Sequence, residues 1–213
     1  MREPDNIRAV EALGVDWLGF IFWPKSSRYV SEKPAYLPTR CKRVGVFVDA
    51  DISDVVQHVK DYGLDIIQLH GHESPEYIRA LAAPLPCRGG AGGRVTIIKA
   101  ISVSTRDDIA LSKQYDGLVD YFLFDTKCKT VGGSGEHFDW SVLDAYDGET
   151  LFLLSGGIGP DDAERVLAFH HEKCVGIDLN SRFETEPALK DINKLREFIK
   201  KIRSNEQNQR TIQ

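Results

Sequence analysis

The chain contains the stretch Val119-Asp120-Tyr121-Phe122-Leu123-Phe124-Asp125-Thr126-Lys127, which is followed by Gly132-Gly133-Ser134-Gly135. Its apolar run has the length of a buried β-strand, and the run ends on the carboxylate of Asp125 before a glycine-rich loop. Burying an ionised carboxylate costs free energy unless the group is paired or takes part in chemistry. Asp125 is therefore the first candidate for a functional residue.

Further apolar or β-branched runs of strand length occur along the chain, and segments with helical spacing separate them. The seven predicted strands begin near Trp17, Val44, Asp65, Val95, Val119, Leu151 and Val175. A repeated strand–helix unit with near-continuous apolar strands predicts a parallel sheet that is covered on both faces. The predicted fold class is therefore α/β, of the (βα)8 TIM-barrel type. Because such a barrel begins on a strand and this chain begins on a predicted helix, we expect the first β-strand to be the missing one.

Proline, glycine and capping residues mark the predicted helix boundaries. Ser74-Pro75 predicts an N-cap followed by the first helical position, and Gly63 predicts the end of the preceding helix. Ser104 and Asp107 have the spacing of a capping box at the start of another helix. Since no composition shift divides the chain, we predict a single barrel domain over residues 1–203 and a polar C-terminal tail over residues 204–213.

Composition narrows the class of protein. The 213 residues carry a formal net charge of −5, which gives no basic footprint for nucleic acid. No apolar run approaches the ~20 residues that span a bilayer, and the polar start has no signal-peptide core. Scattered cysteines in an acidic chain of this size indicate free thiols in a reducing cytosol. These are Cys41, Cys87, Cys128 and Cys174. We therefore expect a cytoplasmic protein with no nucleic-acid or membrane partner.

In a βα barrel, function is located at the carboxyl ends of the strands. Besides Asp125, that rule selects Arg28, His70 and Asp178, each of which follows a predicted strand. Arg28 suits bidentate contact with a carboxylate or phosphate, although it could be a solvated surface arginine. His70 could contact substrate or be a hydrogen-bonded core residue.

Asp125 itself has two interpretations. It could act as a general acid or base, or it could be a carboxylate that is ion-paired with Lys99 or Lys127. Its place at the end of a predicted barrel strand favours the functional interpretation.

The last two strand–helix loops are candidates for a phosphate site. Gly156-Gly157 follows the sixth predicted strand, and Ser181-Arg182 follows the seventh. TIM barrels frequently hold phosphate between these two loops and the N-terminus of a short helix. We therefore predict phosphate binding at Gly156, Gly157, Ser181 and Arg182. The alternative is that the glycine pair only makes a tight turn.

Two other motifs lie before strands, and hence on the opposite face of the predicted barrel. The first is the glycine-rich run Arg88–Arg94, which lacks the strand–loop–helix order of a phosphate-binding loop. The second is His170-His171-Glu172 with Cys174, which has no supporting second cluster for a metal ion. We predict no metal site.

Taken together, these features resemble the phosphoribosylanthranilate isomerase family of tryptophan biosynthesis. The resemblance runs from Asp5 to about Arg203. Its most specific parts are a Pro-Lys-Ser-x-Arg-Tyr loop and a Gln-Leu-His-Gly strand end, in the correct order. The stretches that carry it are Gly19–Val30, Val44–Val48, Gln68–Gly71, Glu73–Tyr77, Asp125 with Gly132–Gly135, Phe138–Trp140, Ser155–Ile158 and Gly176–Asp178.

The resemblance implies a single barrel that acts without metal or organic cofactor. It implies an Amadori rearrangement of N-(5-phosphoribosyl)anthranilate, an aminoaldose, to 1-(2-carboxyphenylamino)-1-deoxyribulose 5-phosphate, an aminoketose. Asp125 matches the general acid that protonates the furanose ring oxygen, and Arg28 matches the arginine that holds the anthranilate carboxylate. The remaining matches are the phosphate site at Gly156, Gly157 and Ser181, and the pocket-lining positions His70 and Asp178.

The sequence departs from the family in two places. The family begins with a strand ending Lys-x-Cys-Gly, whose cysteine is the general base that takes the sugar C2′ proton, and this chain starts just after that point. The expected missing strand and the missing base are therefore the same segment, and we expect the chain as written to be impaired. Cys128 is the one cysteine on a predicted functional-face loop, but nothing in the sequence fixes its thiolate. In addition, Ser181-Arg182 stands where family members often have Ser-Gly.

Three alternatives remain open beside this interpretation. A non-catalytic phosphosugar-binding barrel would bind the ligand without turnover. An indole-glycerol-phosphate synthase would need catalytic lysines at strand ends, and only Lys99 is close to one. A ribulose-phosphate epimerase would need metal ligands at several strand mouths, which His70 alone does not supply. The sequence is compatible with a monomer or a homodimer.

Overall fold

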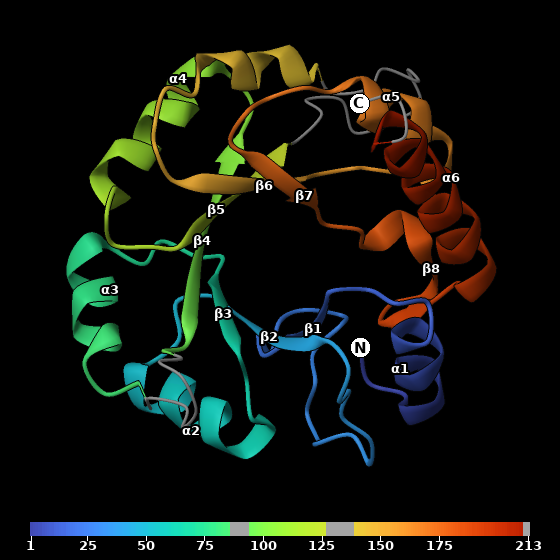
Figure 1. The fold of residues 1–213 in the computed structure, drawn as a ribbon. Coiled ribbons are helices and arrows are strands. Elements are labelled where there is room, and N and C mark those ends of the chain that lie inside the picture. The colour runs from blue at the N-terminus through green and yellow to red at the C-terminus, as the bar shows by residue number, and fades with distance from the viewer. Residues whose placement is uncertain (86–93, 127–138, 211–213) are drawn as a thin grey trace.

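A computed structural model describes residues 1–85, 94–126 and 139–210 of the chain. It contains a parallel seven-stranded sheet in which neighbouring strands follow chain order. The strands curl into an incomplete ring with helices on its outside (Figure 1). They are β1 (Trp17–Ile21), β2 (Lys42–Phe47), β3 (Ile66–Leu69), β4 (Thr96–Val103), β5 (Tyr121–Thr126), β6 (Leu151–Ser155) and β7 (Cys174–Ile177). The predicted α/β class and the seven predicted strands are confirmed.

Side-chain alternation divides each strand between the inside of the ring and the helix layer. A buried inner cluster consists of Val44, Ile66, Ile98, Ala100, Leu123 and Leu153. The outward residues join a larger core beneath the helices, and Phe122 and Phe124 of β5 belong to it. Because Leu123 faces inward, Asp125 is placed on the same inner face, at the carboxyl end of β5.

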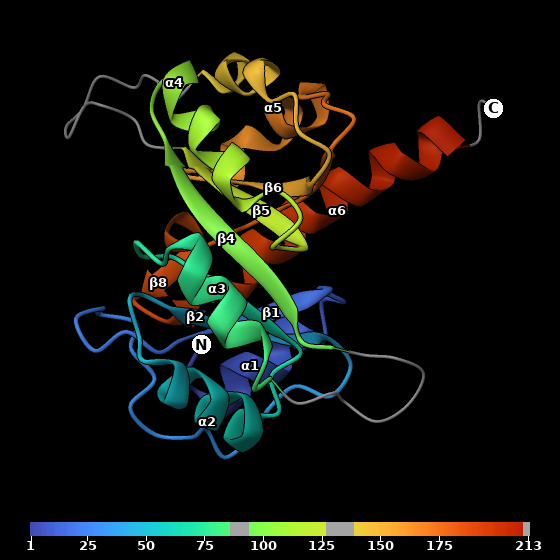
Figure 2. The same cartoon turned by 90° about the vertical axis from the view of Figure 1, so that its left-hand side faces the viewer.

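Helices cover the outside of the sheet, as a view turned by 90° also shows (Figure 2). They are α1 (Pro4–Glu11), α2 (Ile52–Tyr62), α3 (Pro75–Ala82), α4 (Arg106–Ile109), α5 (Ala163–Ala168) and α6 (Ile192–Arg210). Gly63 ends α2 with a left-handed φ of 58°, and the Ser74 hydroxyl accepts the Tyr77 N–H at the start of α3. Both predicted boundaries are therefore confirmed. α6 continues to Arg210, past the predicted boundary at residue 203.

Several short elements complete the fold. They are the 3-10 helices η1 (Ala110–Tyr115), η2 (Trp140–Ala145), η3 (Pro160–Asp162) and η4 (Ser181–Phe183), and an antiparallel pair, β8 (Glu184–Glu186) with β9 (Leu189–Lys190). The capping box before α4 lies one residue later than predicted, because the Thr105 N–H donates to Asp108 Oδ2 at 2.8 Å. Within the described ranges, no helix is long and apolar enough to cross a membrane.

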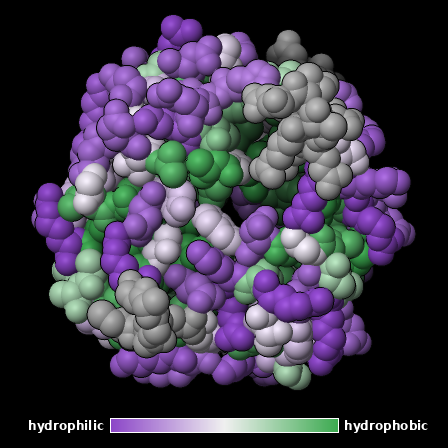
Figure 3. Space-filling model, viewed as in Figure 1, coloured by the Kyte–Doolittle hydropathy of each residue, from purple (hydrophilic) through white to green (hydrophobic). Residues whose placement is uncertain are grey.

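The sheet is open between its two edge strands, β1 and β7. A cavity of about 1230 Å³ lies there, and the space-filling view shows the same face of the molecule hollowed near its centre (Figure 3). Its wall includes Leu153 from the inner face, Gly19 and Ile177 from the strands, and Val10 and Phe198 from the helix layer. The edges of β1 and β7 that pair with no described strand therefore both face this cavity.

The start of the chain lies beside this opening. The α-amino group of Met1 donates to the Gly19 carbonyl of β1 at 2.9 Å, and Met1 is buried. Burial lowers the pKa of this amine to about 5, because the site disfavours the charged form. A peptide N–H at the same position would make the same hydrogen bond without that cost. A segment in front of Met1 would therefore run along the exposed edge of β1.

An apolar strand of about six residues added in front of Met1 is expected to stabilise the fold. It would fill the cavity and pair with β1 and β7, and each large apolar side chain that it buries contributes roughly 1.5–3 kcal/mol. We expect urea denaturation to give a free energy of unfolding at least about 3 kcal/mol higher than for the 213-residue chain. A glycine–serine extension of equal length is the control. Equal stabilisation by both extensions would contradict this description of the cavity.

Candidate active site

Asp125 lies between two serines at the mouth of the ring, which is the end where the carboxyl ends of the strands meet. Its register partners are Ser102 on β4 and Ser155 on β6. The Asp125 side chain is 20% exposed, and its Oδ2 lies 3.4 Å from Nε2 of His70 at the end of β3. The alternative partner Lys99 is excluded, because Lys99 forms a buried ion pair with Glu73 instead. The other alternative partner, Lys127, lies outside the described residues.

His70 connects Asp125 to the inner face of β3. The side-chain amide nitrogen of Gln68 lies 2.9 Å from His70 Nδ1. An amide nitrogen can only donate, so with this amide orientation Nδ1 is the acceptor and a neutral imidazole carries its proton on Nε2. His70 therefore directs its N–H toward Asp125, which is a more specific placement than the predicted lining of a pocket.

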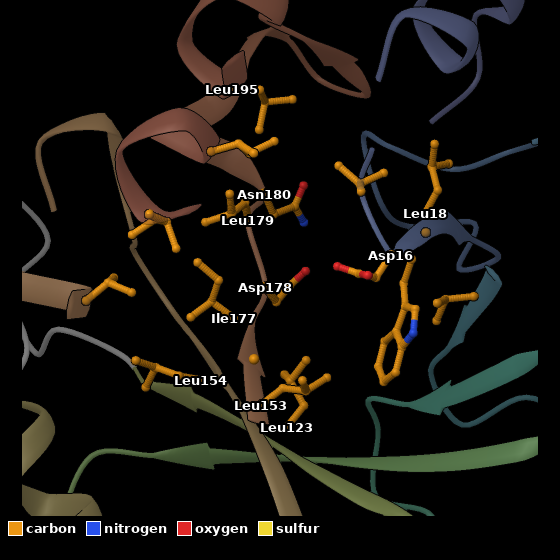
Figure 4. Close-up of a pocket in the computed structure, with 18 of the residues that line it drawn as sticks. Asp16, Leu18, Leu123, Leu153, Leu154, Ile177, Asp178, Leu179, Asn180 and Leu195 are labelled. Carbon is orange, nitrogen blue, oxygen red and sulfur yellow. The ribbon is translucent and has the colours of Figure 1, made fainter. Parts of the chain in front are cut away.

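Asp178 follows β7 and points into the cavity, which Figure 4 shows with the inner-face residues Leu123 and Leu153 nearby. Its Oδ2 accepts a hydrogen bond from the Ser155 hydroxyl at 3.0 Å. Burial raises the pKa of the Asp178 carboxyl, whereas the Ser155 hydrogen bond and the charge of Lys190 oppose this rise. The mouth thus holds two carboxyl groups in different surroundings.

Arg28 lines the same cavity, but its guanidinium is already paired. Its Nε and Nη2 lie 2.8 and 2.7 Å from Oε2 of Glu184, whose side chain is only 4% exposed. Lys190 Nζ lies 3.3 Å from the other carboxylate oxygen. Although burial works against ionisation, the Arg28 hydrogen bond and the Lys190 charge hold the pKa of Glu184 below its usual value. Nη1 is the Arg28 nitrogen for which the described residues provide no partner.

The sequence analysis missed Glu184 and Lys190. Both follow β7, the last strand of the parallel sheet, and so lie on the functional face of the barrel. That position was the one signal in the sequence that pointed to them. Lys190 links two parts of that segment, because its ammonium contacts Glu184 and also donates to the Asn180 carbonyl at 3.0 Å.

The predicted phosphate residues lie on two adjoining loops. Gly156 and Gly157 have φ values of 96° and 66°, a conformation that favours glycine, and the position of a Cβ on Gly157 is open space. Ser181 and Arg182 begin η4 and are exposed. The Arg182 stem lies over Gly159, where a Cβ would be 3.0 Å from Arg182 Cδ. Among the described residues, no carboxylate lies within ion-pair distance of Arg182.

Several predicted features lie outside the described residues, namely Cys87, Cys128, the glycine-rich segment Gly132–Gly135 and all of the Arg88–Arg94 run except Arg94. Cys41 and Cys174 are free thiols. A search of the described ranges for groups of three or more histidine, cysteine or acidic side chains that could hold a metal ion found none, and His170-His171 is thus not part of one.

The arrangement suits acid–base chemistry on a substrate with anionic ends. The Asp125 carboxyl group, with a histidine neighbour, lies at the centre of the mouth. A paired arginine lies on the β1 side, and beyond β6 and β7 lies a glycine turn with an arginine that has no ion-pair partner among the described residues.

Comparison with known proteins gives one consistent result. The model of the family described as N-(5'phosphoribosyl)anthranilate (PRA) isomerase matches residues 1–201. The N-(5'-phosphoribosyl)anthranilate isomerase of Phocaeicola vulgatus is 49% identical over 203 residues, which cover 95% of each chain.

Two solved structures of this family agree. Phosphoribosyl anthranilate isomerase from Thermotoga maritima has a TM-score of 0.77 and 30% identity, covering 96% of each chain. A complex of phosphoribosyl anthranilate isomerase with reduced 1-(o-carboxyphenylamino)-1-deoxyribulose 5-phosphate has a TM-score of 0.77 and 28% identity, covering 96% of this chain and 99% of that one. The chain belongs to the N-(5'-phosphoribosyl)anthranilate isomerase family.

Proposed function

We propose that the reaction of this protein is the Amadori rearrangement of N-(5-phosphoribosyl)anthranilate to 1-(2-carboxyphenylamino)-1-deoxyribulose 5-phosphate in tryptophan biosynthesis, for which the 213 residues supply the acid and the substrate-binding groups. The observation that carries the proposal is the place of Asp125. Its carboxyl group lies on the inner face at the end of β5, 3.4 Å from His70 Nε2 and beside the cavity mouth. A positioned acid at this point can reach a sugar ring held over the mouth.

In the first step, Asp125 acts as the general acid. It gives its proton to the furanose ring oxygen while the C1′–O bond breaks, and the anthranilate nitrogen lone pair forms the C=N bond of a Schiff base. His70 is placed to orient the Asp125 carboxyl group through its Nε2–H. Asp178, whose pKa is raised by burial, offers a second carboxyl group for a hydrogen bond with a sugar hydroxyl.

The two anionic ends of the substrate have matching partners. Arg28 is held by Glu184, and we assign its remaining Nη1 to the anthranilate carboxylate. The backbone of Gly156-Gly157 and the side chains of Ser181 and Arg182 would bind the phosphate. Because Glu184 neutralises part of the Arg28 charge, the anthranilate end relies on geometry more than on net charge.

The second step needs a general base that removes the C2′ proton and gives an enolamine, which then tautomerises to the ketone. The family resemblance places that base on a cysteine at the end of a strand in front of Met1. The cavity between β1 and β7 is where such a strand would lie. A thiol base, like the free Cys41 and Cys174, suits a reducing cytoplasm.

The rate of the rearrangement should depend on an upstream strand that ends in cysteine. We expect the 213-residue chain to turn over at least about a hundredfold more slowly than a chain extended by such a strand, because one proton-transfer group contributes roughly 10²–10⁴-fold. The turnover rate is measured from product formation, by fluorescence or by coupling to a following enzyme. The same extension with serine in place of the cysteine is the control. Equal rates with and without the extension would rule out this account of the base.

In the extended chain, Asp125→Asn should lower kcat by about 10²–10⁴-fold, because the amide cannot protonate the ring oxygen. Binding of the reduced product analogue should change by less than about threefold, since the shape of the side chain is kept. Asp147→Asn is the control, because Asp147 is an exposed carboxylate that pairs with Lys113. A kcat within threefold of the parent would remove Asp125 from the acid role.

Arg182→Gly tests the phosphate end. A charge-assisted hydrogen bond contributes about 1.5–3 kcal/mol, so KM and the inhibition constant of inorganic phosphate should each rise about tenfold or more, while kcat stays within about twofold. Arg182→Lys keeps the charge and should lose less. If Arg182→Gly left both constants unchanged, the phosphate would have to bind elsewhere.

A non-catalytic phosphosugar-binding barrel is the competing function. It predicts tight binding of the product analogue with no turnover in either the 213-residue or the extended chain. Absence of turnover in both forms would therefore favour it over the isomerase.

A further inference from the structure

A buried ion pair lies directly behind the end of β3, on the outer side of the sheet. Lys99 of β4 and Glu73 of the loop before α3 lie 3.0 Å apart, and their side chains are 3% and 1% exposed. Removing two charges from water is costly, and a buried pair of this kind is often no more stabilising than two apolar side chains of similar volume. The contacts of this ion pair therefore say more about its role than its contribution to the free energy of unfolding does.

All three N–H groups of the Lys99 ammonium have acceptors. Besides Glu73, they are the carbonyls of Leu69, at 3.3 Å, and of Gly71, at 2.8 Å. These are the residues on either side of His70. The Glu73 carboxylate accepts the Gly71 N–H at 3.0 Å. The ion pair therefore binds both the N–H and the carbonyl group of Gly71.

The pair also maintains a strained turn next to His70. Glu73 accepts the N–H of Asp49 at 3.0 Å, and Asp49 has a left-handed φ of 49°, a conformation that costs a non-glycine residue roughly 1–2 kcal/mol. A Cβ on Gly71 would be 2.4 Å from Asp49 Oδ1, so the two turns fit together only with glycine at this position. The end of β3 is therefore tightly packed, and the ion pair contacts its backbone on both sides of His70.

His70 transmits this arrangement to the mouth of the ring. Its backbone N–H donates to the Phe47 carbonyl at 2.8 Å, and its imidazole lies between Gln68 and Asp125. The distance from Nε2 to Asp125 is 3.4 Å, which is near the limit of a hydrogen bond, so a small shift of the β3 end would break the contact.

We propose that the Lys99–Glu73 ion pair is a positioning device that fixes His70 and, through it, the carboxyl group of Asp125. This rests on the proposed role of Asp125 as the general acid. Neither Lys99 nor Glu73 lines the cavity, and both are buried. They act through the backbone on either side of His70.

Nitrogen NMR of the His70 imidazole tests the proposal without requiring turnover. His70→Asn identifies the signals. We expect the unaltered chain to show a single tautomer, with Nδ1 unprotonated and Nε2 protonated. In Glu73→Gln and in the apolar double variant Glu73→Leu with Lys99→Met, the two nitrogen signals should approach each other by at least half of their original separation, as the imidazole exchanges between tautomers.

The double variant separates positioning from stability, because an apolar pair can replace a buried ion pair at little cost in unfolding free energy. In the active, extended chain its kcat should fall by about tenfold to a hundredfold with KM within about twofold, as expected for a misplaced catalytic group.

Arg43→Met is the control. Arg43 also donates to backbone carbonyls, those of Pro38 and Tyr62, but at the start of β2, far from the β3 end in the strand direction. It should lower stability and leave the His70 signals unchanged.

Unchanged His70 signals in both variants would overturn the proposal, whatever their activity. Altered signals in the Arg43→Met control would also overturn it, because the shift would then report general loosening. If the extended chain shows no turnover, the isomerase assignment fails while the NMR result still decides whether the ion pair fixes His70.

Discussion

Side-chain alternation along the parallel strands is the constraint on which the site depends. Leu123 is buried in the inner cluster of the ring, so the residue two positions later must face the same way, and that residue is Asp125. The same rule brings His70 and Asp178 to the inner face at the ends of β3 and β7. The sheet thus delivers three titratable side chains to one mouth before any of them contacts another.

The polar groups at the mouth are then ordered by partners outside it. Glu184 fixes Arg28 from the segment after β7, and the Lys99–Glu73 pair fixes the backbone around His70 from the helix layer. Ser155 connects β6 to Asp178. Side chains around the mouth therefore hold the functional groups in place. The ring of described strands is open only at the cavity between β1 and β7.

Much of this could be predicted from the sequence, for local reasons. Apolar runs, Gly63 and Ser74-Pro75 fixed the strands and helix ends, because burial and capping are encoded by neighbouring residues. The capping box was predicted one residue early, since Ser104 and Thr105 both offer a hydroxyl group and the backbone decides between them. The pairs Arg28–Glu184 and Lys99–Glu73 could not be predicted. Their partners are 156 and 26 residues apart. The pairing of β3 with β4 brings Lys99 to Glu73, and the curling of the sheet brings the segment after β7 to Arg28.

We propose that Asp125 supplies the acid of the rearrangement and that the cavity between β1 and β7 would accommodate a further strand carrying the base. Release of deuterium into water from substrate labelled at C2′ follows the proton abstraction directly. The 213-residue chain is predicted to release the label at least about a hundredfold more slowly than a chain extended by a strand ending in cysteine. Release at equal rates from both chains would contradict this role of the further strand.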